Sequence, residues 1–201
     1  MALSLQEQEH DSDRRVLARV AAGDVESFGV LVERHEKRLT GLCERMLHNT
    51  SEAQEAAQEV FLKAFRKAGS FQPKGQVYTW LYRIAVNHCL NLLRRRRLAK
   101  FLSFGDVGRS TVDSDEDGPL FDPEDSAPDA EQRLATARRW RQTRELIAAL
   151  PAAQRAVLTL AKFEGLSYRE IAEVLEITEG AVESRLFRAM QRLRKAQETM
   201  G

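Results

Sequence analysis

Residues 78–97, YTWLYRIAVNHCLNLLRRRR, bring three aromatic residues, two asparagines and four consecutive arginines onto one short segment. Aromatic faces stack on unpaired bases, contributing about 1–3 kcal/mol per base. An asparagine amide presents a donor and an acceptor together, which suits a base edge, and arginines bind phosphates. The combination predicts a surface that reads single-stranded or locally melted nucleic acid. The candidate contacts are Tyr78, Trp80, Arg83, Asn87, Asn91, Arg94 and Arg95.

The same segment has helical periodicity with two chemically different sides. At 100° per residue, apolar residues spread over one broad side, while four polar residues fall within a strip about 80° wide. The apolar side comprises Leu81, Ile84, Ala85, Val86, Cys89, Leu90, Leu92 and Leu93, and the polar strip comprises Arg83, Asn87, Asn91 and Arg94. A core-facing helix with a solvated back explains the apolar side, but it leaves the arginine block and the neighbouring aromatics unexplained. We therefore favour a nucleic-acid contact along the polar strip.

A second, independent signal lies near the C-terminus. Ser167 and Glu170 have capping-box spacing and Thr178 is a good N-cap, so two short helices separated by a tight turn are predicted. This is the helix-turn-helix arrangement, whose second helix enters the major groove. Its polar side comprises Ser184, Arg185, Arg188, Gln191 and Arg192, and its apolar side comprises Val182, Leu186, Met190 and Leu193. The alternative is a surface helix whose arginines only solvate it, but the preceding capped helix and turn argue against it.

Other elements must position these two predicted nucleic-acid-binding segments, and the sequence pattern predicts that those elements are helices. Apolar residues recur near helical spacing across residues 24–47 and 57–65, and Ser51 with Gln54 has the spacing of a capping box. Residues 69–76, with two glycines and a proline, interrupt the helical pattern. No alternating strand pattern is present, so the sequence predicts an all-α protein.

Charge is distributed unevenly, although the net charge is +1. Residues 1–100 carry 17 basic and 12 acidic residues, residues 101–135 carry 2 and 10, and residues 136–201 carry 12 and 8. From Val60 to Lys100 there are ten basic residues and no acidic one, which predicts a polyanionic partner. The middle segment contains three prolines and three glycines, which is typical of linkers. We expect two small helical domains, an N-terminal helical bundle over 14–100 and a helix-turn-helix domain over 136–201, joined by an acidic flexible linker over 101–135.

Composition argues against several other classes of protein. No stretch approaches the roughly 18 apolar residues of a membrane span, and the N-terminus lacks the features of a signal peptide, so we expect a cytoplasmic protein without membrane insertion. Cys43 and Cys89 form no CxxC pattern and the four histidines have no ligand spacing, so we expect buried thiols, no metal and no cofactor. No phosphate-binding loop and no nucleophile with an evident base is present, so neither an enzyme nor a small-molecule substrate is expected.

Two blocks of the sequence resemble one known family. FRKAGSFQPKGQVYTWLYRIAVNHCLNLLRRRR and LPAAQRAVLTLAKFEGLSYREIAEVLEITEGAVESRLFRAMQRLR look like the extracytoplasmic function (ECF) branch of the bacterial sigma-70 family. The resemblance covers nearly the whole chain outside the linker, with the blocks in the family's order. It implies a transcription initiation factor that binds core RNA polymerase, melts the minus-ten promoter element with its first domain and binds the minus-thirty-five element with its second.

The resemblance also implies roles for individual residues. AQEAAQEVFLKAFR (53–66) resembles the helix that binds the polymerase clamp, although Ala56 and Ala57 stand where bulkier apolar residues are usual. Asn87 matches the asparagine beside the pocket for a flipped minus-ten base. The matching clamp positions are Gln58, Glu59 and Phe61, and the expected minus-thirty-five contacts are Ser184, Arg185, Phe187, Arg188 and Arg192. The implied partners are core RNA polymerase, promoter DNA and an anti-sigma factor.

The alternative function is a stand-alone helix-turn-helix DNA-binding transcriptional regulator with a helical sensor domain. Such a regulator would bind its operator tightly without polymerase, usually as a dimer. It would also have no need of an acidic linker. Dependence of promoter-specific transcription on core polymerase separates the two interpretations.

Overall fold

The computed structural model describes residues 5–71, 76–103 and 141–200, and every regular element in these ranges is helical. The first group of helices is α1 (Leu5–Ala21), α2 (Phe28–Leu47), α3 (Thr50–Lys67), the single 3-10 turn η1 (Ala68–Ser70) and α4 (Val77–Ser103). The second group comprises helical residues 141–148, α6 (Ala152–Lys162), α7 (Tyr168–Leu175) and α8 (Glu179–Met200). The prediction of an all-α protein is confirmed.

The connection between α2 and α3 is a tight turn made by two residues. His48 ends α2 in the left-handed region, with φ 56°, and its N–H donates to the carbonyl of Glu44. Asn49 is extended, and its side-chain oxygen accepts a 2.8 Å hydrogen bond from the Glu52 N–H. The expected capping box beginning at Ser51 is therefore wrong. Asn49 satisfies the exposed backbone donor first, so the helix begins one residue before Ser51.

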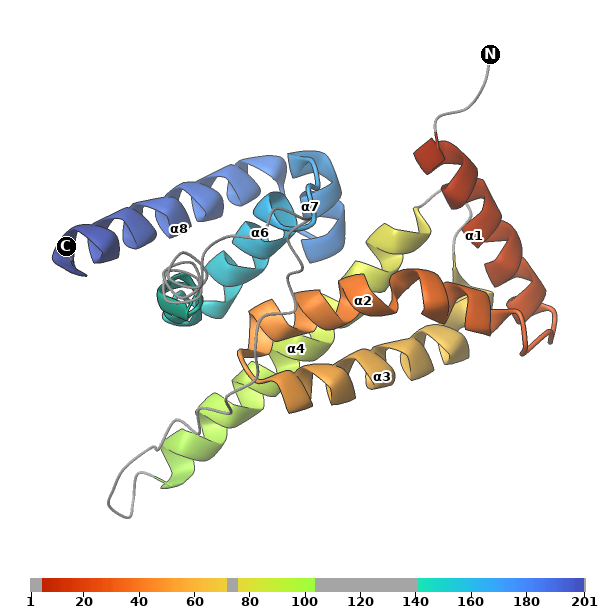
Figure 1. Cartoon of the computed structure of the whole chain (residues 1–201), viewed down its shortest axis with the longest axis horizontal. Coiled ribbons are helices and arrows are strands. Elements are labelled where there is room, and N and C mark those ends of the chain that lie inside the picture. The colour runs from red at the N-terminus through yellow and green to blue at the C-terminus, as the bar shows by residue number, and fades with distance from the viewer. Residues whose placement is uncertain (1–4, 72–75, 104–140, 201) are drawn as a thin grey trace, which may run out of the picture.

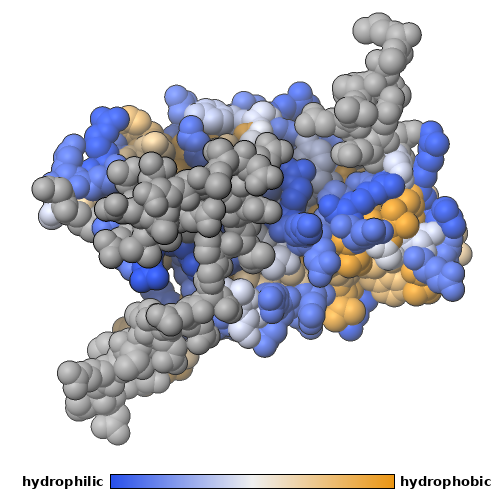
Figure 2. Space-filling view, viewed as in Figure 1, coloured by the Kyte–Doolittle hydropathy of each residue, from blue (hydrophilic) through white to orange (hydrophobic). Residues whose placement is uncertain are grey.

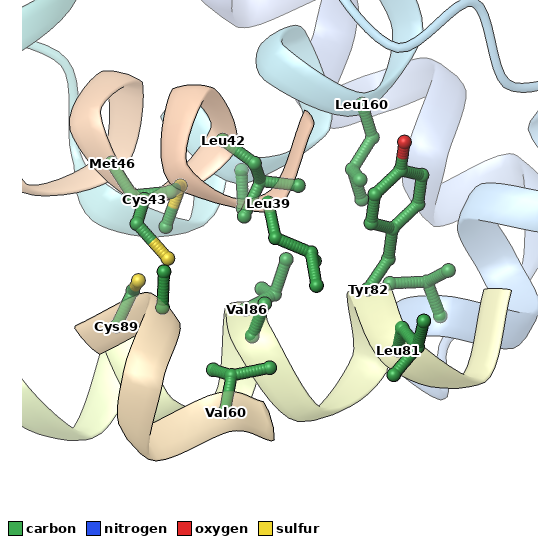
Figure 3. Close-up of a cluster of buried hydrophobic side chains, with 14 of the residues drawn as sticks. Leu39, Leu42, Cys43, Met46, Val60, Leu81, Tyr82, Val86, Cys89 and Leu160 are labelled. Carbon is green, nitrogen blue, oxygen red and sulfur yellow. The ribbon is translucent and has the colours of Figure 1, made fainter. Parts of the chain in front are cut away.

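The core of the first group forms where α2, α3 and α4 meet (Figure 3). Leu39, Leu42 and Met46 of α2 lie against Val60 of α3 and Val86 of α4, all of them fully buried. Small residues at Ala53, Ala56, Ala57 and Ala64 of α3 are buried as well. Because alanine side chains are short, α3 lies close to its neighbours, and this accounts for the alanines where larger apolar residues were anticipated.

Cys43 of α2 and Cys89 of α4 face each other inside this core (Figure 3). Both are fully buried and neither is in a disulfide. A hydrogen bond that the Cys89 thiol donates to Cys43, together with burial, raises the pKa of Cys89 well above its usual range. The two thiols therefore act as small apolar groups, and the expectation of buried thiols is confirmed.

The second group contains the predicted helix-turn-helix. The Ser167 hydroxyl accepts from the Glu170 N–H at 3.3 Å, and the Glu170 carboxylate accepts from the Ser167 N–H at 2.8 Å, which is a complete capping box. Glu176 then turns the chain in the left-handed region, with φ 53°. Thr178 caps α8 by accepting a 3.2 Å hydrogen bond from the Ala181 N–H. Ile171 and Val174 of α7 and Val182, Leu186 and Ala189 of α8 are buried between the helices.

The two groups of helices lie against each other (Figure 1) rather than apart as separate bodies. α6 packs on α2 and α4, and α7 packs on the N-terminal part of α4. Buried residues of both groups belong to one continuous core. The linker expected over 101–135 lies mostly outside the described residues, but α4 continues to Ser103, beyond the expected domain boundary at 100. Likewise α1 begins at Leu5, before the expected boundary at 14.

Among the residues coloured in Figure 2, hydrophilic ones predominate, and hydrophobic residues gather at the end where α2 and α3 lie beside α1. Val25, in the connection between α1 and α2, and Leu62 of α3 are exposed apolar side chains. None of the helices in the described part of the chain combines the length and apolar character needed to cross a bilayer.

Candidate nucleic-acid interface

The polar strip predicted on residues 83–94 lies along α4 and is largely exposed. Val77, Leu81, Val86 and Cys89 turn the opposite side of the helix into the core, with no exposed surface. Asn87, Asn91, Arg94 and Arg95 are exposed on the remaining side. The core contacts therefore fix the rotation of α4, and this rotation presents two amides and two guanidinium groups to solvent together.

The arginine block divides between the surface and the protein itself. Arg94, Arg95 and Arg97 are exposed, whereas Arg96 is partly buried and forms an ion pair with Glu52 of α3. Burial lowers the pKa of Arg96, yet a guanidinium stays charged at any physiological pH. The ion pair holds the C-terminal part of α4 on the start of α3, so three arginines rather than four remain for phosphates.

The aromatic candidates at the start of α4 have different environments. Trp80 is partly exposed and packs edge-on against Phe71, with ring centroids 5.4 Å apart. The ring of Tyr78 is partly exposed and lies 6.1 Å from that of Tyr82. Tyr82 itself is buried. The rings of Trp80 and Tyr78 are thus partly exposed, while Tyr82 belongs to the core.

Two of the predicted nucleic-acid contacts are engaged by α7. The Tyr78 hydroxyl donates to the Glu170 carboxylate, and burial together with this bond raises the pKa of Tyr78 to about 12. Arg83 donates from Nη2 to the Glu173 carbonyl at 2.6 Å, and its Nη1 lies 3.4 Å from the Glu176 carboxylate. Thus α7 covers the N-terminal end of the strip, at Arg83, and the strip is exposed to solvent from Asn87 onward.

Glu164 is the most heavily bonded side chain between the two groups of helices. Its carboxylate is 2% exposed and accepts a 2.7 Å hydrogen bond from the Tyr82 hydroxyl. Arg45 Nη2 donates to its second oxygen at 2.5 Å, and Arg38 Nε lies at 3.7 Å. Tyr82 extends from α4 toward α6 beside Leu160 (Figure 3). Burial, followed by the Glu164 charge, raises the Tyr82 pKa well above its ordinary value. Arg38, Arg45, Tyr82 and Glu164 are called the interdomain cluster below.

A second connection between the groups is made by Arg155 of α6, which is 8% exposed. Its guanidinium donates to the Met46 carbonyl at the end of α2 at 2.6 Å and to the Leu150 carbonyl at 3.1 Å. It also donates to the carbonyls of Ile147 and Ala148. These carbonyls lie at or near helix ends, where intrahelical donors are lacking for most of them, so one planar cation satisfies several at once. The Ile147 carbonyl also accepts from the Leu150 N–H.

The predicted minus-thirty-five residues lie on the outer side of α8. Phe187, Arg188 and Arg192 are exposed, and Ser184 and Arg185 are partly exposed. Met190, expected on the apolar side, is 45% exposed, and Ala189 is buried in its place. The buried side of α8 is therefore narrower than the helical periodicity of the sequence indicated. The exposed surface is correspondingly wider, and it includes one phenyl ring between two arginines.

The three positions matched to clamp binding differ in exposure on α3. Gln58 and Glu59 are exposed. Phe61 is 7% exposed, and its ring lies edge-on to Phe28 of α2, with centroids 6.3 Å apart. Phe61 thus packs in the bundle, whereas its neighbour Leu62 is 48% exposed.

The interdomain cluster and Arg155 were not found from the sequence. Glu164 follows a helix and precedes Gly165, and nothing in its spacing distinguishes it from a solvated carboxylate. Arg38 and Arg45 are about two turns apart on a helix with mixed charge. Only the packing of α6 on α2 brings these groups together, and pairing of that kind has no signature in periodicity.

Comparison with known proteins identifies two matching regions in the chain, one in each group of helices. Residues 31–99 match the family model described as Sigma-70 region 2, and residues 140–193 match that of Sigma-70, region 4. The RNA polymerase sigma-H factor of Pseudomonas aeruginosa is 38% identical over 192 residues, covering 92% of this chain and 94% of that protein. The ECF RNA polymerase sigma-E factor of Escherichia coli is 33% identical over 186 residues, covering 90% and 91%.

Solved structures share the fold as well. CnrH in complex with the cytosolic domain of CnrY superposes with a TM-score of 0.66 at 25% identity, covering 94% of this chain and 99% of that one. RpoE in complex with the anti-sigma factor NepR from Bartonella quintana has a TM-score of 0.65 at 20% identity, covering 86% and 98%.

The chain belongs to the ECF branch of the sigma-70 family of RNA polymerase sigma factors. Members of this class are not enzymes. They direct core RNA polymerase to promoters, with region 2 binding the minus-ten element and region 4 the minus-thirty-five element. Here region 2 includes α2, α3 and most of α4, and region 4 includes α6, α7 and most of α8.

Proposed function

We propose that this protein reads and opens the minus-ten element with the exposed strip of α4. The observation that carries the proposal is the joint exposure of Asn87, Asn91, Arg94 and Arg95 on a helix whose rotation is fixed by its buried side. Asparagine amides supply a donor and an acceptor to a base edge. Arginines neutralise the backbone beside it. Trp80, and Tyr78 once it leaves Glu170, supply stacking surfaces at the start of the same helix.

The minus-thirty-five element is contacted by the outer side of α8 in this proposal. Arg188 is exposed on the side of α8 opposite the buried Val182 and Leu186. Arg185 and Arg192 lie about one turn before and after it. A helix-turn-helix places such positions against base edges in the major groove. Ser184 and Arg185, near the start of the helix, and Arg192, one turn beyond Arg188, complete the proposed contacts.

In this proposal the exposed side of α3 binds the polymerase clamp. Gln58 and Glu59 present polar groups to solvent, and Leu62 adds an apolar one. Phe61 supports this surface from within the bundle through its contact with Phe28. Its proposed contribution to polymerase binding is therefore through the shape of α3.

Simultaneous reading of both promoter elements requires the two groups of helices to separate. Tyr78 and Arg83 are held by α7 and cannot contact DNA while those bonds persist. Two DNA elements two helical turns apart are about 70 Å apart. A linker over 101–135 spans at most about 115–125 Å when extended, which is enough to join the two domains over that distance. We therefore propose domains at 14–100 and 136–201 that part when the protein binds polymerase, with the acidic linker as the tether.

A protein partner that holds the factor inactive is also proposed. CnrH, which shares the fold over most of the chain, was solved in complex with the cytosolic domain of CnrY. We propose that an anti-sigma factor binds this chain in the cytoplasm and keeps it from core polymerase.

Run-off transcription from a promoter library tests the proposal. Transcription is measured with bacterial core polymerase alone, with this protein alone and with both. Specific transcripts are expected only from the combination, sharing sequence motifs at minus ten and minus thirty-five. Tight sequence-specific binding by the protein alone, without any effect on core polymerase, would instead support a stand-alone helix-turn-helix regulator.

A further inference from the structure

A small basic pocket lies between α3 and α4, on the open side of the bundle. It has a volume of about 100 Å³ and is lined by Lys63, His88, Asn91, Leu92 and Arg95. Two of these side chains carry a permanent positive charge, one is titratable, one is an amide, and none is a carboxylate. Donors that converge on a cavity without a carboxylate in its lining favour a bound anion.

Lys63 and His88 are in direct contact inside this pocket. Lys63 Nζ lies 2.5 Å from His88 Nδ1. An ammonium group has only donors, so Nδ1 must accept and the ring proton lies on Nε2. The imidazole is therefore neutral in this arrangement, and part of the hydrogen-bonding capacity of Lys63 is used within the protein.

The surroundings keep His88 neutral. Burial is the largest effect that lowers the pKa of His88, and the charges of Lys63 on α3 and Arg95 on α4 lower it further. Glu59 of α3 acts in the opposite direction, but it does not overcome the others. An anion placed among Lys63, His88 and Arg95 would reverse this balance, because it would stabilise the protonated imidazole.

The position of the pocket identifies the anion. Asn91 and Arg95 belong both to the pocket and to the exposed strip that contains Asn87. A strand whose bases meet Asn87 must therefore carry its backbone past the pocket within one or two nucleotides. A backbone phosphate has the charge and the acceptor oxygens that the pocket lacks.

We propose, building on the promoter-opening function above, that this pocket binds one backbone phosphate of the separated minus-ten strand and that His88 takes up a proton as the phosphate binds. The Lys63 ammonium group then donates to a phosphate oxygen instead of to His88 Nδ1. A proton from solvent binds Nδ1. Asn91 donates its amide N–H groups to the same phosphate. The N–H bond formed at Nδ1 with a proton from solvent is the only covalent change, and the charge gained by His88 offsets part of the phosphate charge.

The proposal predicts a pH dependence with a definite sign. Because the phosphate favours the protonated imidazole, the pKa of His88 is higher in the complex than in the free protein. Affinity for the opened strand therefore rises as the pH falls through the window between these two pKa values. One linked proton limits the slope to tenfold per pH unit.

The experiment measures binding of forked promoter DNA, single-stranded in the minus-ten region, to holoenzyme assembled from core polymerase and the full chain. Lys63→Ala is expected to weaken binding about tenfold and to flatten the dependence of log K on log salt by about 0.7, which corresponds to one phosphate contact on a single strand. His88→Ala is expected to remove the rise in affinity that accompanies a fall in pH through the window between the free and the bound pKa of His88. Lys37→Ala removes an exposed charge on α2 and serves as the matched control. It should keep both the salt slope and the pH dependence.

A single neutral methylphosphonate, placed in turn at each backbone position of the single-stranded segment, locates the phosphate. One position is expected to weaken the wild type about tenfold and to have no further effect on Lys63→Ala. If both pocket variants bind like the wild type at every salt and pH, the pocket proposal is wrong while promoter opening stands. If inorganic phosphate shifts the His88 titration and forked DNA does not, the site takes a free anion and the proposal is overturned. If the wild-type holoenzyme fails to bind the forked DNA, the proposed function itself fails.

Discussion

The hydroxyl of Tyr82 on α4 donates a 2.7 Å hydrogen bond to the carboxylate of Glu164, 82 positions further along the chain. One partner lies in region 2 and the other in region 4. The same carboxylate is paired with Arg45 of α2. A carboxylate that is 2% exposed depends on these partners for its hydrogen bonds, so the pairing favours the closed arrangement of the two regions.

Removing the charge of Glu164 is expected to favour separation of the two regions. Glu164→Gln keeps the shape but weakens the bonds from Arg45 and Arg38, and bonds to charged groups contribute about 1.5–3 kcal/mol. The equilibrium should shift toward the open form by about tenfold or more. Energy transfer between dyes on α3 and α8 measures the separation. Glu173→Gln is the control, because the exposed Glu173 side chain pairs within its own helix with Arg169. Equal separation in both variants would show that Glu164 does not hold the regions together.

Arg188→Ala is expected to alter minus-thirty-five recognition at one or two positions. A base contact by arginine contributes about 1–3 kcal/mol of discrimination. Binding of holoenzyme to a series of minus-thirty-five substitutions measures the change. Lys195→Ala, also exposed on α8, provides the comparison for loss of charge alone. A uniform loss across all sequences would assign Arg188 to a phosphate contact instead.

Stability is expected to fall in mild acid because of His48. Burial, with smaller contributions from Arg155 and Arg144, lowers the pKa of His48 from 6.5 to about 4, and its Nε2 has no hydrogen-bond partner. The unfolded chain therefore binds the proton more tightly. Stability is fully present above about pH 6.5 and is lost as the pH falls toward about 4, by up to about 3 kcal/mol.

His48→Asn tests this expectation, because asparagine tolerates the left-handed backbone that His48 adopts. Urea unfolding of the wild type and the variant is compared at neutral pH and in mild acid. The variant should lose less stability than the wild type between the two conditions. An identical loss would mean that other groups cause the acid sensitivity.

Much of the fold follows from local features of the sequence. Helical periodicity and capping residues predicted the helices of both regions, and the Ser167–Glu170 capping box is present as expected. The polar strip of α4 is also exposed as its periodicity indicated, since a helix with one apolar side can bury only that side. The start of α3 was misplaced because Asn49 and Ser51 are both good caps, and only the backbone conformation at Asn49 distinguishes them.

The contact between the regions could not be predicted in the same way. The sequence placed Tyr82 among several aromatics near the strip. In the structure its hydroxyl donates to the buried carboxylate of Glu164, just after α6. Arg155 was one arginine among many, yet it satisfies carbonyls at three helix or turn ends. Such pairings depend on how two helical groups pack, which periodicity within each group does not record. The basic pocket of Lys63 and His88 lies within the first group, where it depends on how α3 packs against α4, and periodicity within one helix does not record that packing either.

Asn87 is the residue on which the minus-ten assignment depends most. It is exposed on α4, one turn after Arg83 and one turn before Asn91. Extruding a base costs a few kcal/mol, which hydrogen bonds to its edge must offset. Alanine offers no donor or acceptor, so Asn87→Ala should impair promoter opening while leaving polymerase binding and minus-thirty-five preference intact. Gln197→Ala removes an exposed amide at the far end of α8 and should leave all three unchanged.

Transcription from a complete set of single-base minus-ten substitutions, compared between wild-type and Asn87→Ala holoenzyme, tests the account most directly. We predict that the variant loses base preference at one minus-ten position, with a discrimination change of about 1–3 kcal/mol, and keeps the wild-type preference elsewhere. If Asn87→Ala retains the wild-type preference at every position, Asn87 does not read a base, and the proposed minus-ten surface on α4 is wrong.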